Sequence, residues 1–422
     1  MAEEKPAERR LQAISRHLLL PSQIHTQELY LEPESVISPS PVIIGGMVLD
    51  IHAKPYAHPN PGTTTPGKVR YFNGGVARNV AECMSKLGSK PFMISVVGDD
   101  VAGDLLMRYW KTARLPTEGI QQLPGIITPA ASLIFDCNGE LAAAVVSVEA
   151  VETFLTPDWI KQFQPNIFAA PVVMVDANLP PHSLEVACQS MLSCEVCYPL
   201  WFEPISVAKS TRIASIVNHV TFASPNEIEL IAMANALSPK KGFNFVPAEA
   251  TKGIGQPVDY LFEQLKPSIQ FLLQKGIKML IVTLGSNGVF FCCGELSFTK
   301  SNLNLSTSSF NGIYELMKET CLPKQCVSYV ESAQRSIKSF AFHFPALPAS
   351  VVSLTGAGDC LVGGILASIC SGLNVMQSVA VGIAVAKAAV EAETNVPAEF
   401  SLSNVADEAK KIISAVKPLL LE

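Results

Sequence analysis

Short apolar runs alternate with amphipathic helical patterns along most of the chain. The run Pro41–Gly46, which ends in two glycines, predicts a buried strand that leads into a tight turn. Further strand-like runs occur at residues 91–97, 172–175, 220–223 and 279–284. Helical periodicity favours helices at residues 75–87, 103–112, 359–371 and 375–393. Strands that alternate with helices are typical of a mostly parallel sheet covered on both faces, and we therefore predict the α/β class.

Two regions depart from this alternation and predict a smaller layer within a single domain at 41–422. Residues 51–72 and 130–148 contain short strand patterns and turns without a helix between them. We expect them to form a small antiparallel layer over the main sheet, where such a layer can act as a lid. Two other stretches, about 237–257 and 298–344, indicate insertions, and we expect partly disordered surface loops there.

Residues 1–40, which end in a Pro/Ser-rich run, predict a tail and linker. Within them Arg10-Leu11, five further residues and His17-Leu18 resemble a type-2 peroxisomal targeting sequence. Apolar residues recur at helical spacing through this stretch, so the motif would lie on an amphipathic helix. We expect the segment to bind an import receptor and the protein to be peroxisomal. The alternative is an ordinary helix end that matches by chance in a cytoplasmic protein.

The composition limits the partners that the chain can have. The 422 residues are 48% hydrophobic and 16% charged, which suits a globular protein with a large core. The net charge of −6 gives no basic field that would attract nucleic acid or an anionic membrane. No apolar stretch approaches the ~20 residues that a membrane span needs, and the charged first residues do not predict a secretory signal peptide.

The chain contains 11 cysteines, but their positions do not indicate a disulfide framework. Cys83, Cys360 and Cys370 lie in apolar helical patterns, where free thiols behave as small hydrophobic groups. Cys194-x-x-Cys197 is the one spacing typical of a metal site, and no second pair or nearby histidines complete four ligands. We therefore expect ordinary reduced cysteines in a reducing compartment.

The strongest candidate for chemistry is the segment Thr-Gly-Ala-Gly-Asp that ends at Asp359. A strand-like run that starts at Val351 precedes it, and the helical pattern begins near the aspartate. Small residues let the backbone approach an anion, and the N–H groups at a helix start point toward it. A carboxylate at the mouth of such a site repels phosphate, but it can accept a proton from an attacking hydroxyl. The alternative is that Asp359 only caps the helix.

A glycine pair and an asparagine form the second candidate. Gly74 and Gly75 precede a helix and permit close approach of a ligand, while Asn79 in the first turn offers a donor and an acceptor to hydroxyl groups. The alternative is a glycine turn with an asparagine that faces solvent.

Two further segments suit a nucleotide and its metal ion. Asn226 and Glu229 are three residues apart at a helix start and share a face, where they could hold water around Mg²⁺. The alternative there is a simple capped helix. The strand predicted at residues 279–284, which contains Thr283, and the turn after it, which contains Gly285 and Gly288, suit nucleotide phosphates or ribose, although this signal is weak by itself.

These four elements, in this order, resemble the ribokinase-like carbohydrate kinases, also called the PfkB family. The resemblance extends from about Val42 to the last helix, with one glycine-rich signature near each end. It implies a Rossmann-like three-layer α/β/α fold with a small β-sheet lid that often serves for dimerisation. It also implies transfer of phosphate from ATP, with Mg²⁺, to a hydroxyl group of a small sugar-like molecule.

The resemblance assigns roles to three sets of residues. The catalytic base and its anion hole would be Asp359 with Gly356, Ala357 and Gly358. The ligands of the sugar hydroxyls would be Asp50, Gly74, Gly75 and Asn79. The nucleotide and Mg²⁺ site would include Asn226, Glu229, Thr283, Gly285 and Gly288.

One departure from the family pattern concerns monovalent ions. Family members commonly have Asp-Thr-Thr before the glycines, and that aspartate helps to form a potassium site in several relatives. This chain has Ser353-Leu354-Thr355 instead. The change argues against activation by K⁺, whereas phosphate transfer does not depend on that position.

Four segments narrow the expected substrate. Residues 74–83, 201–209, 343–349 and 389–396 resemble the branch of this family that phosphorylates pseudouridine. The resemblance implies transfer to the ribose 5′-hydroxyl, and the import-like N-terminus is similar to the plant arrangement, in which this step occurs in peroxisomes. A kinase of the same fold for another nucleoside or sugar, such as adenosine, inosine or ribose, is the alternative.

Proteins of two other classes would share parts of this pattern. A kinase-like binding protein without turnover would usually lack the base or the glycines, and both remain here. A Rossmann-type dehydrogenase needs Gly-x-Gly-x-x-Gly after the first strand, and Gly45-Gly46 is not part of such a motif. The sequence therefore favours an active kinase.

Overall fold

The computed structural model describes residues 39–59, 62–137, 141–191, 199–239, 242–244, 257–294, 312–326 and 339–421. The chain divides into two units, Met1–Ser38 and Pro39–Glu422, and the described residues all belong to the second. The N-terminal motif, the segment Cys194-x-x-Cys197 and most of the two predicted insertions lie outside the described residues.

Ten strands form the main sheet of this second unit. Along the chain they are β1 Val42–Ile44, β4 Phe92–Gly98, β5 Ile120–Leu123, β8 Val173–Asp176, β9 Leu200–Glu203, β10 Phe222–Ala223, β11 Met279–Thr283, β12 Val289–Cys293, β13 Phe340–Phe344 and β14 Lys417–Leu419. Their order across the sheet is β14-β13-β12-β11-β10-β9-β8-β1-β4-β5. Neighbouring strands are parallel from β5 to β11 and antiparallel from β11 to β14. The predicted mostly parallel α/β sheet is therefore confirmed, with an antiparallel edge.

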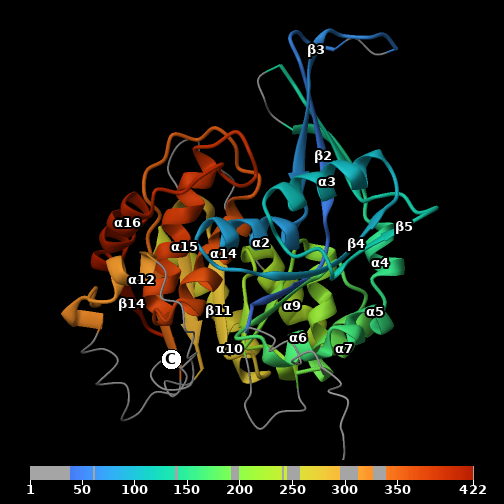
Figure 1. Ribbon diagram of the computed structural model, residues 1–422. Helices are drawn as coiled ribbons and strands as arrows, with labels where there is room; N and C mark the ends of the chain where they lie inside the picture. Colours follow the sequence, from blue (N-terminus) through green and yellow to red (C-terminus); the bar gives the residue numbers. More distant parts are fainter. Residues whose placement is uncertain are drawn as a thin grey trace, which may run out of the picture. The chain divides into compact units, whose positions relative to one another are not determined.

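Helices cover both faces of this sheet (Figure 1). One apolar core contains side chains of α2 Val76–Lys86, α3 Val101–Thr112, α12 Gly312–Met317, α14 Ala357–Cys370, α15 Val375–Val390 and α16 Leu402–Ser414. The other contains side chains of α4 Glu149–Phe154, α5 Pro157–Gln162, α6 Gln164–Ala169, α7 Pro181–Gln189, α9 Glu227–Leu237 and α10 Val258–Gln274. The connections include the short helix α8 Val207–Ser210 and the 3₁₀ turns η1 Thr211–Ser215, η2 Val217–His219 and η3 Gly285–Asn287.

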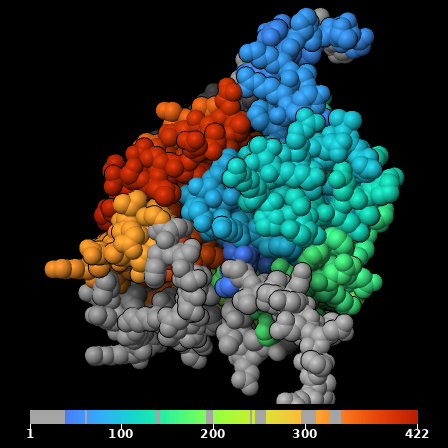
Figure 2. Space-filling model, in the orientation of Figure 1, coloured from blue at the N-terminus to red at the C-terminus, as the bar shows by residue number. Residues whose placement is uncertain are grey.

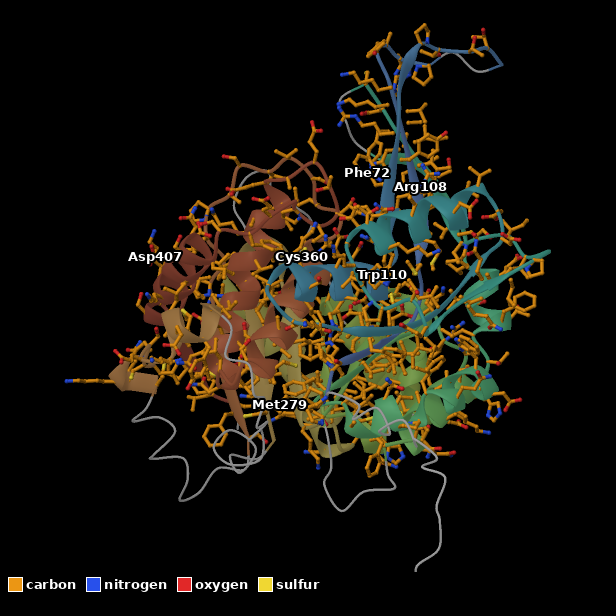
Figure 3. The ribbon with its side chains drawn as sticks, in the orientation of Figure 1. Phe72, Arg108, Trp110, Met279, Cys360 and Asp407 are labelled. Atoms are coloured by element: carbon orange, nitrogen blue, oxygen red, sulfur yellow. The ribbon has the colours of Figure 1, made fainter. Side chains whose placement is uncertain are left out.

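Successive residues of the central strand β1 point into the two cores in turn. Ile43 packs in the first core, while Val42 and Ile44 pack in the second, as the period of a strand requires. Trp110 of α3 and Cys360 of α14 are fully buried on the first side (Figure 3). This arrangement confirms the three-layer α/β/α fold that the sequence predicts.

A second sheet of four strands forms the smaller layer. Its strands are β2 Val48–Pro55, β3 Gly67–Gly74, β6 Ala130–Phe135 and β7 Leu141–Ser147, in the order β3-β2-β6-β7. The β2–β3 hairpin projects from the rest of the unit (Figures 1 and 2). The expectation of an antiparallel layer is wrong for one pair, because β2 and β6 are parallel. Since β2 follows β1 and β6 follows β5, two strands of the same direction, both enter the lid from the same edge of the main sheet.

Two predictions in the C-terminal part of the chain are wrong. The segment Phe340–Phe344, expected inside an insertion, is the buried strand β13 between β12 and β14. The run that starts at Val351 forms no strand, and its side chains Val351, Val352 and Leu354 are exposed. Pro345 follows β13 directly and cannot donate to a ladder, which accounts for the end of the strand.

Every cysteine that the structure describes is a free thiol. Cys83, Cys360 and Cys370 are buried in the helical layers, as their apolar surroundings in the sequence indicate. Within the described ranges, no helix is long and apolar enough to cross a membrane.

Candidate active site

Acidic residues gather at the carboxyl ends of the central strands. Asp50 lies in β2, which follows β1 directly, while Asp176 ends β8 and Glu203 ends β9. The strands β1, β8 and β9 are neighbours in the main sheet, and open α/β sheets bind ligands at this edge. Asp50 is among the residues predicted from the sequence, whereas Asp176 and Glu203 are not: Asp176 is a single acid at a strand end, and Glu203 lies in the segment 201–209 without a predicted role of its own.

The start of α14 leaves backbone donors without partners. Gly356 precedes the helix with φ 83°, and a Cβ there would lie 2.1 Å from the carbonyl oxygen of Asn395, so only glycine fits. No described residue accepts a hydrogen bond from the N–H of Gly358 or Asp359, and that of Ala357 makes a single long bond of 3.4 Å. A Cβ at Gly358 would meet nothing within 4 Å, so a ligand can approach this backbone. Unpaired N–H groups and the helix dipole together suit a phosphate oxygen.

Asp359 lies in the first turn of α14 and contacts α2. Its Oδ2 accepts a hydrogen bond of 2.5 Å from Nδ2 of Asn79, and no described residue donates to its other oxygen. It makes no capping hydrogen bond, so the capping alternative is wrong. The pKa of Asp359 is raised to about 6: burial is the largest cause, the bond from Asn79 and the charge of Arg78 oppose it, and the charges of Asp50 and Asp176 add to it. A carboxylate that titrates near neutral pH and has one free oxygen can accept a proton from a hydroxyl.

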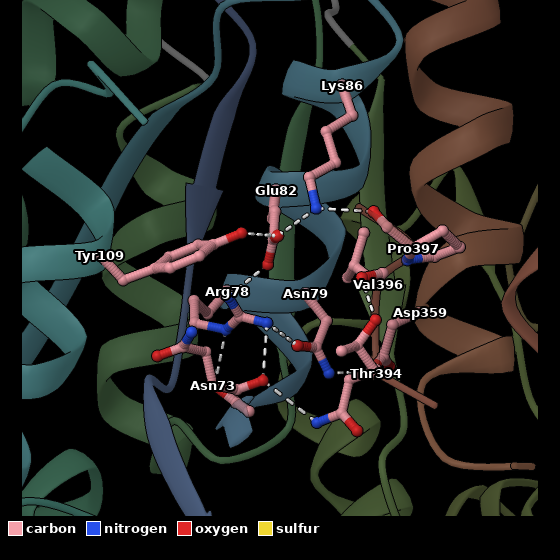
Figure 4. A network of polar contacts seen from close by, with 12 residues as sticks. Asn73, Arg78, Asn79, Glu82, Lys86, Tyr109, Asp359, Thr394, Val396 and Pro397 are labelled. Atoms are coloured by element: carbon pink, nitrogen blue, oxygen red, sulfur yellow. Dashed lines mark hydrogen bonds and ion pairs between the residues drawn. The ribbon is translucent and has the colours of Figure 1, made fainter. Parts of the chain in front are cut away.

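Asn79 is buried in α2, with 3% of its surface exposed, so the alternative of an asparagine that faces solvent is wrong. Its Oδ1 accepts a hydrogen bond from Nη2 of Arg78, and its Nδ2 donates to Asp359 (Figure 4). Its expected role as a ligand of a substrate hydroxyl stays a prediction. The structure adds a direct contact between this asparagine and the predicted base, which the sequence does not indicate.

Asp50 and the glycine pair form the next part of the site. Asp50 is 7% exposed, and its Oδ2 accepts a hydrogen bond of 2.8 Å from Nδ2 of Asn395. Gly74 passes so close to this carboxylate that a Cβ would lie 2.2 Å from Oδ2. Gly75 has φ 94°, and a Cβ there would lie 2.4 Å from the carbonyl oxygen of Gly46. Gly74 thus lets the chain pass against Asp50, whose pKa is raised by burial, and Gly75 lets it pass against the backbone of Gly46.

Asn395 connects these two parts of the site. Its side chain donates to Asp50 and, at 3.1 Å, to the carbonyl oxygen of Asn73, while its own carbonyl packs against Gly356. It lies between α15 and α16, far from both partners along the chain. No local pattern in the sequence reveals such a contact, so only the tertiary structure shows it.

Asn226 and Glu229 begin α9 as a capping box. Oδ1 of Asn226 accepts hydrogen bonds from the N–H groups of Ile228 and Glu229, and Oε2 of Glu229 accepts one of 3.0 Å from the N–H of Asn226. The capped helix is therefore confirmed, and a role in Mg²⁺ binding stays a prediction. In the part of the chain that the structure describes, no group of three or more His, Cys, Asp or Glu could hold a metal ion. A bound Mg²⁺ would take its other ligands from water and phosphate oxygens, as this ion commonly does.

The predicted nucleotide turn lies next to this helix start. Thr283, the last residue of β11, forms a parallel bridge with Asn226, and its N–H donates to the carbonyl oxygen of Pro225 at 2.9 Å. Gly285 has φ 56° and open space at its Cβ position, so a ligand can approach it. At Gly288, φ is 92° and a Cβ would lie 2.1 Å from the carbonyl oxygen of Phe344, so packing against β13 explains this glycine.

Glu203 is an acidic residue near the predicted base. Its Oε2 accepts a hydrogen bond from the Ser224 hydroxyl, which accepts one of 2.8 Å from Nε1 of Trp201. Burial raises the pKa of Glu203 well above its usual range, and the negative charges of Asp359 and Glu229 add to this effect. Glu203 is therefore within electrostatic reach of both the base and α9.

Comparison with known proteins identifies the family. The family model of the pfkB family carbohydrate kinases matches residues 39–301 and 323–397. The chain belongs to the pfkB family of carbohydrate kinases. This kinase is a phosphotransferase that uses an alcohol group as acceptor.

Two relatives of the kinase are pseudouridine kinases. The Arabidopsis thaliana enzyme is 47% identical over 381 residues, which cover 90% of this chain and 98% of that protein. The Escherichia coli enzyme is 24% identical over 251 residues, which cover 59% of this chain and 72% of that protein. The structure of Arabidopsis thaliana ribokinase with ribose and ATP aligns with a TM-score of 0.62 and 17% identity, over 89% of this chain and 99% of that chain. This likeness shows a shared ribokinase-like fold.

Proposed function

We propose that this kinase transfers the γ-phosphate of ATP to the ribose 5′-hydroxyl of pseudouridine and so forms pseudouridine 5′-phosphate. The observation that carries the transfer is the position of Asp359 beside the unpaired N–H groups of α14. The choice of pseudouridine is supported by 47% identity to the pseudouridine kinase of Arabidopsis thaliana over most of both chains. The use of ATP is supported by the fold shared with a ribokinase that was solved with ribose and ATP.

The chain's own residues divide the chemical step between them. Asp359 takes the proton of the 5′-hydroxyl while that oxygen forms a bond to the γ-phosphorus, and the bond to the β–γ bridging oxygen breaks to release ADP. The N–H groups at the start of α14 stabilise the negative charge on the phosphoryl oxygens. Asp50 and Asn79 hold ribose hydroxyls, and Gly74 and Gly75 let the chain pass close to Asp50 and to the backbone of Gly46.

The start of α9 offers the oxygen donors that Mg²⁺ prefers. The amide of Asn226 and the carboxylate of Glu229 lie beside Thr283 and the open turn at Gly285, where we place the nucleotide phosphates. When bound, the ion would neutralise charge on the phosphate oxygens. We propose no requirement for K⁺, since Ser353 stands where several relatives have a carboxylate.

We also propose that the lid closes over the nucleoside and joins two copies of the kinase. The strand register places Val69, Tyr71 and Val145 on the face of the lid sheet opposite Asp50. Their side chains are 59%, 63% and 71% exposed. Exposed apolar residues that gather on one face of a sheet are typical of an interface between protein chains, so this face suits a second copy.

A panel of acceptors tests the substrate. The purified kinase is incubated with ATP, Mg²⁺ and pseudouridine, uridine, adenosine or ribose in turn, and the products are separated by chromatography. We expect pseudouridine 5′-phosphate to form at least about tenfold faster than any other product, which is a modest discrimination for an enzyme site. Equal rates with adenosine or ribose would overturn the choice of pseudouridine. The variant Asp359→Asn, prepared in parallel, controls for a contaminating kinase.

The N-terminal motif supports a further proposal, that residues 1–40 direct the kinase to peroxisomes. The motif lies outside the described residues, so its support comes from the sequence alone. A fusion of residues 1–40 to a fluorescent protein should colocalise with a peroxisomal marker in plant cells. The same fusion with Arg10→Ala and His17→Ala is the control and should stay in the cytosol. Cytosolic fluorescence from the unaltered fusion would refute the proposal.

A further inference from the structure

Arg78 is a buried cation next to the predicted base, and its guanidinium is almost completely bonded. It is 1% exposed, its Nε donates to the carbonyl oxygen of Gly74 at 3.0 Å, and its Nη2 donates to that of Asn73 at 2.8 Å. Nη2 also donates to Oδ1 of Asn79, and Nη1 donates to Oε2 of Glu82 (Figure 4). Arg78 thereby connects the end of the lid strand β3 to α2.

The contact with Arg78 decides which end of the Asn79 amide faces Asp359. A guanidinium has only donors, so the atom of Asn79 that faces it must be the oxygen. The amide nitrogen then points to Asp359 and donates to Oδ2 at 2.5 Å. With the amide reversed, its oxygen would face the carboxylate and repel it. Arg78 therefore determines that Asn79 is a donor to the base.

Arg78 also belongs to a cluster that carries a surplus positive charge. Glu82, which is buried, accepts hydrogen bonds from Arg78, from the Tyr109 hydroxyl and, at 2.5 Å, from Lys86. The charges of Arg78 and Lys86 lower the pKa of Glu82 although burial opposes them, so this carboxylate is ionised near neutral pH. Two positive charges against one negative charge leave a net charge of +1 in the cluster.

The charged groups that surround Asp359 are otherwise acidic. Asp50 from β2 and Asp176 from β8 raise the pKa of Asp359 by their charge, and the charge of Asp359 in turn raises the pKa of Glu203 from β9. Arg78 from α2 acts in the opposite direction on both Asp359 and Asp50. A second cation that lowers either pKa does not appear among the described residues.

We propose that Arg78 is a positioning residue of this kinase, which orients Asn79 toward Asp359 and supplies the positive charge that keeps the base ionised among its acidic neighbours. Arg78 touches neither reactant, so it acts through Asn79 and through the electric field. The inference rests on the proposed role of Asp359 as the catalytic base. A purely structural role, as a buried ion pair with Glu82, is the competing explanation.

The pH profile of kcat separates these explanations, because the two partners of the ion pair have opposite charges. On the acid side of its pH profile kcat should fall as Asp359 becomes protonated. In Arg78→Gln this acid limb should move to higher pH by about one unit or more, the effect expected when a nearby opposite charge is lost. From a pKa of about 6, a shift of one unit reduces the ionised fraction of Asp359 at pH 6 from about one half to about one eleventh, so kcat at that pH should fall at least about fivefold below the wild-type value. In Glu82→Gln, Arg78 keeps its charge and loses its counter-ion, so the limb should stay or move to lower pH. Both variants remove one partner of a buried pair and should destabilise the fold alike.

Arg78→Lys provides the second test and remains useful if Arg78→Gln does not fold. It keeps the charge but not the planar fork, so the limb should stay near its original pH while the plateau of kcat falls. If Arg78→Gln and Glu82→Gln lose thermal stability equally and the acid limb of kcat keeps its wild-type pH in both, Arg78 acts only as the structural ion-pair partner of Glu82. The same conclusion follows if Arg78→Lys has an unchanged plateau and Glu82→Gln moves the limb upward. Near-normal turnover of Asp359→Asn would instead overturn the base, and with it the proposed mechanism.

Discussion

Substitution of Gly358 by alanine should separate stability from catalysis at the start of α14. A Cβ at this position meets no atom within 4 Å, and the residue is the second of the helix. Alanine is favoured over glycine in helices by about 0.5–1 kcal/mol, since it loses less backbone entropy on folding. We therefore expect the free energy of unfolding of Gly358→Ala to equal that of the wild type or to exceed it by up to about 0.5 kcal/mol, since the first turn realises only part of this preference.

The same methyl group should damage phosphate transfer. It would occupy the open space from which a phosphoryl oxygen approaches the N–H groups of Gly358 and Asp359. Loss of one such donor from a comparable site costs about 10²–10³-fold in kcat. We expect a fall of at least about 100-fold in kcat for Gly358→Ala, with an unchanged circular dichroism spectrum.

The assay combines thermal unfolding with steady-state kinetics on the same preparations. Gly356→Ala is the matched control, because its φ of 83° and the 2.1 Å approach to Asn395 should cost both stability and activity. A Gly358→Ala variant with normal stability and near-normal kcat would show that phosphate does not approach this backbone. That result would refute the assignment of the anion hole.

Three further variants test other parts of the site. Asp359→Asn should lower kcat by at least about 100-fold. The pKa of Asp359 is about 6 in the folded protein and 3.8 in the unfolded chain, so the wild type should lose stability as pH rises between these values. An equal loss of stability in Asp359→Asn would contradict the raised pKa. Asn395→Ala removes a hydrogen-bond donor to Asp50, and it should raise KM for the nucleoside about tenfold while KM for ATP stays unchanged. An unchanged KM for the nucleoside would show that Asn395 does not support nucleoside binding through Asp50. In analytical ultracentrifugation Tyr71→Glu should sediment as a monomer, whereas Lys54→Glu, on the opposite face of the lid sheet, should remain a dimer. A Tyr71→Glu variant that is still dimeric would exclude the proposed interface.

The helix start at Asp359 could be predicted from sequence because its signal is local. Glycine before an apolar helical pattern permits the left-handed conformation that other residues rarely adopt, and the structure has a left-handed glycine at 356 and unpaired donors after it. Asn226 and Glu229 are a similar case, since their spacing alone predicts a shared helix start. Patterns that depend on residues a few positions apart are therefore recovered well.

The contacts that complete the site could not be predicted, because they join residues that are distant in the chain. Asn395 reaches Asp50 across 345 residues, and the bond between Asn79 and Asp359 spans 280 residues. The parallel pairing of β2 with β6 likewise depends on the direction of strands in another sheet. Val351 illustrates the opposite error, since an apolar β-branched residue suggests a buried strand and yet is 62% exposed.

We expect the N–H groups at the start of α14 to meet much of the phosphate charge in this kinase. The guanidinium of Arg78, the buried cation next to the predicted base, is already bonded to four acceptors. A phosphate that enters an edge with several acidic side chains is repelled unless unpaired N–H groups and a metal ion offset its charge. Backbone N–H groups cannot change their direction as a lysine side chain can, so their alignment with the phosphate depends on the local backbone. One methyl group at Gly358 should for this reason lower kcat, because the N–H groups beside it cannot turn toward a displaced phosphate.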